Sequence, residues 1–236
     1  MAGTASRPAA GALWKRDSRI PQVLLALALG AGFLDAASYL GFGHVFPANM
    51  TGNTVLLAVA AIRGNPTHAA RSVTALAGFA GGVALGAAIV RRRGRWPRRA
   101  AGIFWLECVL LAALLFLWGV AGTAAARYWL IALASAAMGG QSVAVRASHV
   151  SGVQTTYMTS TYQSAVARLI FRLRGIREEN AGPALPGSAW ITYGVGALIG
   201  ALAESGWGVS SVAVPLAIVA AVAISAIRNR SGVGMS

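Results

Sequence analysis

The chain has 236 residues, of which 56% are apolar and 11% are charged, and its formal net charge is +14 at pH 7. A soluble domain of this length cannot bury so much apolar surface, so the composition predicts an integral membrane protein. The arginines lie in short runs between apolar segments and not along one helical face, which argues against a nucleic-acid-binding protein despite the positive charge.

Six apolar segments are each close to the roughly 20 residues that a helix needs to cross a hydrocarbon core of about 30 Å. We therefore predict an all-α, polytopic membrane helical bundle of about six transmembrane helices, plus two polar re-entrant or broken segments. A single membrane domain extends over residues 20–227, between tails at residues 1–19 and 228–236. The predicted spans lie near residues 21–43, 72–90, 101–121, 128–150, 188–205 and 208–227.

Four basic clusters predict the orientation, because cytoplasmic loops carry an excess of Lys and Arg. The clusters precede the first span, fill residues 91–99, occupy residues 168–177 and follow the last span. All four fall on one side if the segments around residues 45–62 and 153–170 enter the bilayer and return to the same face. We therefore predict a multi-pass protein of the bacterial cytoplasmic (inner) membrane with both termini in the cytoplasm.

Two polar, helix-breaking segments, residues 45–54 and 153–162, interrupt the apolar sequence. A chain at membrane depth tolerates irregular backbone and open polar groups only beside protein or a water-filled cavity. Amide and hydroxyl groups there can bind small polar solutes or ions, and a helix beginning after Thr51 would direct its positive dipole end at the site. The candidate pathway residues are Asp35, Asn49, Thr51, Gly52, Asn53, Thr155, Thr156 and Thr159.

These residues also admit a structural interpretation, in which Thr51 and Asn53 cap a helix and Gly52 permits close packing. Asp35 has two interpretations as well. A carboxylate inside a span costs about 2.5–3.5 kcal/mol or more unless it faces protein or water. Asp35 is therefore either a proton-coupling or cation-coordinating group, or a neutral acid that is hydrogen-bonded across a helix interface.

A second pair of charged residues, Glu107 and Arg146, is predicted at similar depth in two spans. Opposite charges at one depth are expected to pair, either as a buried ion pair that orients the two helices or as a gate. Removal of one partner is then expected to destabilise the protein more than removal of both.

Glycines recur at four-residue spacing in two spans, which removes side chains from one stripe of a helix and lets another helix approach closely. This packing acts either within the chain or between two copies in a homo-oligomer. The predicted packing glycines are Gly78, Gly82, Gly86, Gly196 and Gly200.

The sequence has few signals for chemistry. Cys108 is the single cysteine, and the three histidines lack the spacing of metal ligands. No phosphate-binding loop, nucleophile elbow or pair of catalytic carboxylates is recognisable. We therefore predict no enzyme activity, no metal and no cofactor.

The two halves of the domain, about residues 21–121 and 128–227, align with each other. Matching Met50 with Met158 also matches Gly32 with Gly140. Each half then consists of a span, a polar hairpin and two further spans, and the halves begin at opposite faces of the membrane. This pattern predicts an inverted internal repeat.

Two runs of the first half, GFLDAASYL at residues 32–40 and VFPANMTGN at residues 45–53, resemble the signature of the bacterial YoaK family. Weaker similarity continues through residues 138–146 and 155–159. The family consists of polytopic inner-membrane proteins without an assigned function. The resemblance therefore implies the membrane fold and adds no substrate.

The leading hypothesis from the sequence is a small-solute or ion transporter or channel, because interrupted segments in inverted halves recur where solutes cross membranes. The alternative is a non-transporting structural or lipid-interacting protein, whose basic residues 91–99 bind anionic headgroups of the lipid bilayer.

Overall fold

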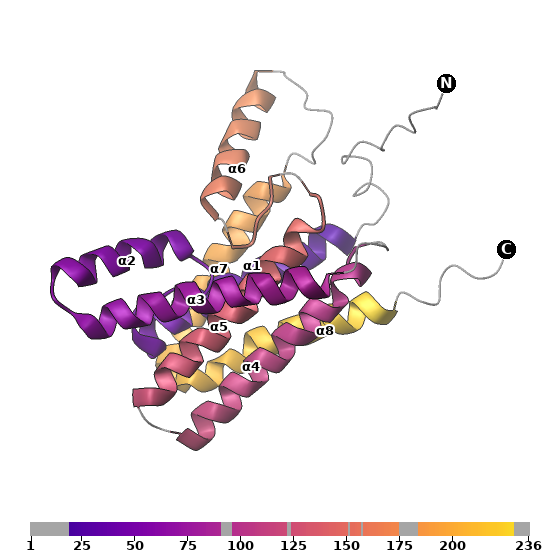
Figure 1. Cartoon of the computed structure of the whole chain (residues 1–236). Helices are drawn as coiled ribbons and strands as arrows, with labels where there is room; N and C mark the ends of the chain where they lie inside the picture. Colours follow the sequence, from indigo (N-terminus) through magenta and orange to yellow (C-terminus); the bar gives the residue numbers. More distant parts are fainter. Residues whose placement is uncertain are drawn as a thin grey trace, which may run out of the picture.

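The structure, a computed structural model, describes residues 19–90, 96–121, 124–150, 152–156, 158–174 and 184–228. Eight α-helices of these ranges form a bundle, shown in Figure 1. In chain order they are α1 (Arg19–Ser38), α2 (Met50–Ile62), α3 (Pro66–Ile89), α4 (Ala101–Ala121), α5 (Ala124–Arg146), α6 (Met158–Leu173), α7 (Leu185–Trp207) and α8 (Ala213–Arg228).

Five continuous helical segments within the described ranges are long and apolar enough to cross a membrane. The fifth, Leu185–Arg228, contains α7, the short 3-10 turn η5 (Gly208–Val212) and α8, and Figure 1 shows the chain turning back at η5. The prediction of an all-α polytopic membrane bundle is confirmed. The predicted tails at residues 1–19 and 228–236 lie outside the described residues except for Arg19 and Arg228, as do residues 91–95 of the arginine-rich loop.

Two pairs of parallel helices make the most extensive contacts of the bundle, α1 with α7 and α3 with α5. Their backbones approach closely because glycines face the partner helix. A Cβ atom added at Gly196 would overlap the carbonyl of Leu29, and one added at Gly82 would overlap the carbonyl of Ala136. The structure therefore places the predicted glycine stripes at these two interfaces within one chain.

α1 and α5 run in opposite directions, as the two apolar clusters of the core show. Leu24, near the start of α1, shares one cluster with Val145, near the end of α5. Leu34, near the end of α1, shares the other cluster with Leu130, near the start of α5. α4 packs against α5 and α8.

Both polar segments consist of a non-helical stretch followed by a short helix. We call residues 44–49, before α2, the first break, and the described residues 147–150 and 152–156, before α6, the second break. α1 ends in a π-helical turn, η3 (Tyr39–Gly43), and His44 adopts a left-handed conformation before the chain reaches α2. His149 adopts the same conformation after α5 and before α6. With 13 and 16 residues, α2 and α6 are shorter than the roughly 20 residues of a full span. In Figure 1 each begins at the bundle and points away from it.

Candidate functional site

The first break is closed by asparagine side chains. Asn49 caps α2 by accepting a hydrogen bond from the Gly52 N–H (3.0 Å). Asn53, which is fully buried, accepts from the Phe46 N–H (2.9 Å) and donates to the Phe46 carbonyl (2.6 Å). One side chain therefore satisfies both the N–H and the carbonyl of Phe46, which is not part of a helix. Backbone groups at membrane depth need such partners, because no water is there to bond them. We refer to such a pair of hydrogen bonds, from one side chain to the N–H and the carbonyl of one residue, as a clasp.

The second break has a matching clasp made by a hydroxyl group. Thr161 accepts from the Gln154 N–H (3.0 Å) and donates to the Gln154 carbonyl (2.9 Å). Gln141 of α5 adds a second tie by donating to the Thr155 hydroxyl (2.9 Å) and to the Leu27 carbonyl (3.3 Å). Thr155 is fully buried, and its hydroxyl group serves a structural contact between α5 and the second break.

Loss of either clasp is expected to destabilise the fold. Asn53→Ala and Thr161→Val each remove two hydrogen bonds to a partly buried backbone N–H and carbonyl. At roughly 0.5–1.5 kcal/mol for each bond, either variant should lower the free energy of unfolding by about 1–3 kcal/mol. Denaturant unfolding in detergent micelles measures this loss. Thr54→Ala is the control, because the Thr54 hydroxyl bonds the Met50 carbonyl at an exposed position and should matter little. Equal, small losses in all three variants would contradict a role for the clasps.

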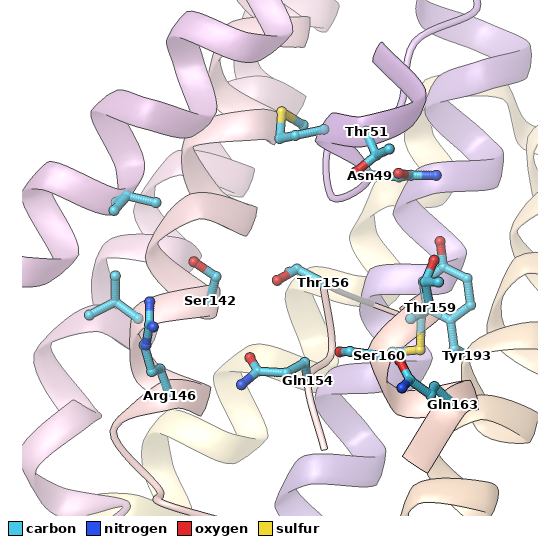
Figure 2. Close-up of a pocket in the computed structure, with 14 residues that line it drawn as sticks. Asn49, Thr51, Ser142, Arg146, Gln154, Thr156, Thr159, Ser160, Gln163 and Tyr193 are labelled. Carbon is cyan, nitrogen blue, oxygen red and sulfur yellow. The ribbon is translucent and has the colours of Figure 1, made fainter. Parts of the chain in front are cut away.

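Between the two breaks lies a cavity of about 620 Å³ (Figure 2). The first residues of both short helices line it, together with residues of α3, α5, α7 and the second break. In Figure 2, Arg146 and Ser142 lie on one side, Thr159, Ser160, Gln163 and Tyr193 lie on the other, and Thr156 and Gln154 lie between them. The lining residues are Asn49, Met50, Thr51, Val83, Ser142, Val143, Arg146, Gln154, Thr156, Met158, Thr159, Ser160, Gln163 and Tyr193.

Asp35 does not line the cavity but supports one of its walls. The side chain is 3% exposed, and its two oxygens accept from the Ala48 N–H (2.7 Å) and the Tyr193 hydroxyl (2.5 Å). The carboxylate thereby joins α1, the first break and α7. Of its two interpretations from the sequence, these contacts match the hydrogen-bonded group at a helix interface.

The structure divides the other predicted pathway residues into two groups. Asn49, Thr51, Thr156 and Thr159 line the cavity. Gly52, Asn53 and Thr155 make the local hydrogen bonds that shape the two breaks.

Glu107 and Arg146 are not brought together. Neither oxygen of the Glu107 carboxylate has a hydrogen-bond partner in the described part of the chain, and the side chain is 1% exposed. Arg146, the last residue of α5, is exposed and lines the cavity. The predicted pair fails because similar depth along two helices does not fix the directions in which their side chains point.

Two important residues were missed from the sequence. Gln141 is an uncharged polar residue inside an apolar span, and that signal was sufficient to single it out. Tyr193 had no comparable signal, because its partner Asp35 is distant in the sequence and the pairing depends on how α7 packs against α1.

Comparisons with known proteins place the chain in a family. The profile of a family described as "Protein of unknown function (DUF1275)" matches residues 23–225. The chain is 33% identical, over 218 residues, to "UPF0700 transmembrane protein YoaK" of Bacillus subtilis (strain 168), and the alignment covers 89% of this chain and 95% of that protein. No solved structure matches the chain significantly. The chain belongs to the DUF1275 family and is a multi-pass membrane protein similar to the YoaK protein.

Proposed function

We propose that this protein is a small-solute or ion transporter or channel of the bacterial cytoplasmic membrane, and that the cavity between the two breaks is its solute site. One observation carries the proposal: the starts of α2 and α6, which come from different halves of the chain, line the same cavity. In many secondary transporters, discontinuous helices from two repeats place their ends at the solute site in this way.

The proposal includes an inverted internal repeat, which the helix contacts support. Exchange of the two halves converts the contact of α1 with α7 into that of α5 with α3, and the contact of α2 with α3 into that of α6 with α7. α1 and α5 run in opposite directions, as inverted halves require. The clasps of Asn53 and Thr161 are separated by the same residue offset as Met50 and Met158.

The proposal also places both termini in the cytoplasm. Arg19 begins α1 and Arg228 ends α8, while Arg98 and Arg99 precede α4. The parallel pairs α1–α7 and α3–α5 allow these basic ends to lie on one side of the membrane, with the turn between α2 and α3, residues 63–65, on the other. This arrangement satisfies the positive-inside rule.

A cysteine-accessibility experiment tests the pathway. In a Cys108→Ser background, Thr51→Cys and Thr159→Cys place single thiols on the cavity wall, whereas Leu198→Cys places one on the exposed apolar surface of α7. A membrane-impermeant thiol reagent should label the first two from opposite faces of sealed vesicles and should leave the third unlabelled. The labelled variants should also lose flux of sodium, chloride, acetate or glycerol in proteoliposomes. Labelling of Leu198→Cys alone, or the absence of flux for every probe, would refute the pathway.

A second function is favoured by a different observation. A cavity of about 470 Å³ at the ends of α3, α4 and α8 is lined by Arg98, Arg99 and Trp105, a combination suited to an anionic lipid headgroup. A non-transporting lipid-interacting protein would show a dependence of stability on anionic lipid and no flux of any probe.

A further inference from the structure

We propose that the cavity between the two breaks binds a small anion, such as a carboxylate or an inorganic anion, with Arg146 as its charge partner. This inference rests on the proposed function, because it names the class of solute taken by the same site. It is carried by the charge of the lining, by the helix ends that meet there and by an unpaired hydroxyl group.

The lining has one sign of charge. Arg146 is the sole cationic residue among the described residues that line the cavity, and none of these is acidic. Its guanidinium group forms no hydrogen bond or ion pair with a described residue, so it is available to a ligand. Asp35 bonds the lining residue Tyr193, but its carboxylate accepts hydrogen bonds from the Ala48 N–H and the Tyr193 hydroxyl and does not itself line the cavity.

Two helix amino termini reinforce this charge. Met50 and Thr51 occupy the first turn of α2, Met158 and Thr159 occupy the first turn of α6, and all four line the cavity. The first N–H groups of a helix have no acceptor within the helix, and the helix dipole places partial positive charge there. A site formed by two such ends disfavours cations and favours anions.

Thr156 provides an independent indication of a ligand. Its side chain is 6% exposed, and its hydroxyl group has no hydrogen-bond partner in the described part of the chain. Figure 2 shows this hydroxyl directed into the cavity on the side of Ser142 and Arg146. A buried hydroxyl group is rarely left without a partner, so a group inside the cavity is expected to complete it. An anion can accept a hydrogen bond from this hydroxyl and a stronger, charge-assisted one from the guanidinium group of Arg146.

Chloride binding tests the inference without requiring transport. The protein is placed in nanodiscs of phosphatidylcholine, which has no net charge, and the broadening of the ³⁵Cl magnetic-resonance line is titrated with chloride and then competed with nitrate and acetate. Arg146→Gln should weaken binding at least about tenfold, because a hydrogen bond to a charged group contributes about 1.5–3 kcal/mol. Arg146→Lys should retain part of the binding, and Thr156→Val should weaken it several-fold. Arg127→Gln, which removes the same charge from an exposed residue that does not line the cavity, should leave the broadening unchanged.

The outcomes separate this inference from the proposed function. Equal broadening in wild type, Arg146→Gln and Arg127→Gln would overturn the anion site, even if proteoliposomes showed flux of sodium or glycerol. Arg146-dependent broadening without any flux would support the anion site and refute the transporter. A headgroup could supply the same anionic chemistry, so a second set of nanodiscs contains phosphatidylglycerol. Loss of chloride and nitrate binding in those discs would assign the cavity to lipid and overturn the small-anion site.

Discussion

Gly82→Ala is expected to destabilise the protein strongly, whereas Gly81→Ala, one residue away, is expected to be neutral or stabilising. A methyl group at Gly82 would overlap the backbone carbonyl of Ala136, so α3 and α5 must move apart to admit it. Overpacking of this kind typically costs about 1–3 kcal/mol, and backbone atoms cannot relax as a flexible side chain can. Gly81 is exposed with no atom near the added methyl group, and alanine is favoured over glycine in a helix by about 0.8–1 kcal/mol.

The α1–α7 interface provides an independent copy of this experiment. A methyl group at Gly196 would overlap the Leu29 carbonyl, while one at Gly194 would meet open space. Gly196→Ala should therefore be destabilising and Gly194→Ala should not, as measured by thermal unfolding of each variant in detergent micelles. If the substitutions at Gly82 and Gly196 were as stable as those at Gly81 and Gly194, the close approach of the two helix pairs would be incorrect.

The fold was largely predictable because its strongest determinants are local. The length of an apolar run and the position of the next polar segment set where a helix begins and ends, and the predicted span at residues 101–121 coincides with α4. The four-residue spacing of Gly78, Gly82 and Gly86 identified a packing surface because the spacing follows from the geometry of one helix. The sequence did not identify α5 as the helix on which this surface packs, because that choice depends on contacts between distant segments.

The site was predictable only in part for the same reason. Polar residues that interrupt an apolar run are visible in the sequence. Four of those predicted in this way line the cavity, namely Asn49, Thr51, Thr156 and Thr159. The roles within each break were less visible, because an asparagine that caps or clasps the backbone has the same composition as one that contacts a solute. The Glu107–Arg146 pairing was predicted from depth alone, and depth does not define the direction of a side chain.

Asp35→Ala is expected to be among the most destabilising single substitutions in the site. It leaves the Ala48 N–H and the Tyr193 hydroxyl without acceptors, and a buried donor left unpaired costs about 1–3 kcal/mol. Asp35→Asn retains one carbonyl oxygen for Ala48 and should lose less. Tyr193→Phe removes one bond only and should lose least, since hydrogen bonds between membrane helices average about 0.6 kcal/mol with a maximum near 1.7.

The cycle formed by Asp35→Asn, Tyr193→Phe and the double variant isolates the contact between α1 and α7. If the hydrogen bond joins the two helices, the double variant will lose less stability than the sum of the single variants, and Thr51→Cys will become more reactive to thiol reagents as the first break loosens. Strict additivity would show that the two groups act separately. Because Asp35 holds both Ala48 and Tyr193, the same carboxylate links the first break to a cavity wall formed by α7. Flux that persists in Asp35→Asn proteoliposomes would therefore assign Asp35 to holding the cavity in shape. Loss of flux in an Asp35→Asn variant of near-normal stability would instead assign Asp35 to coupling.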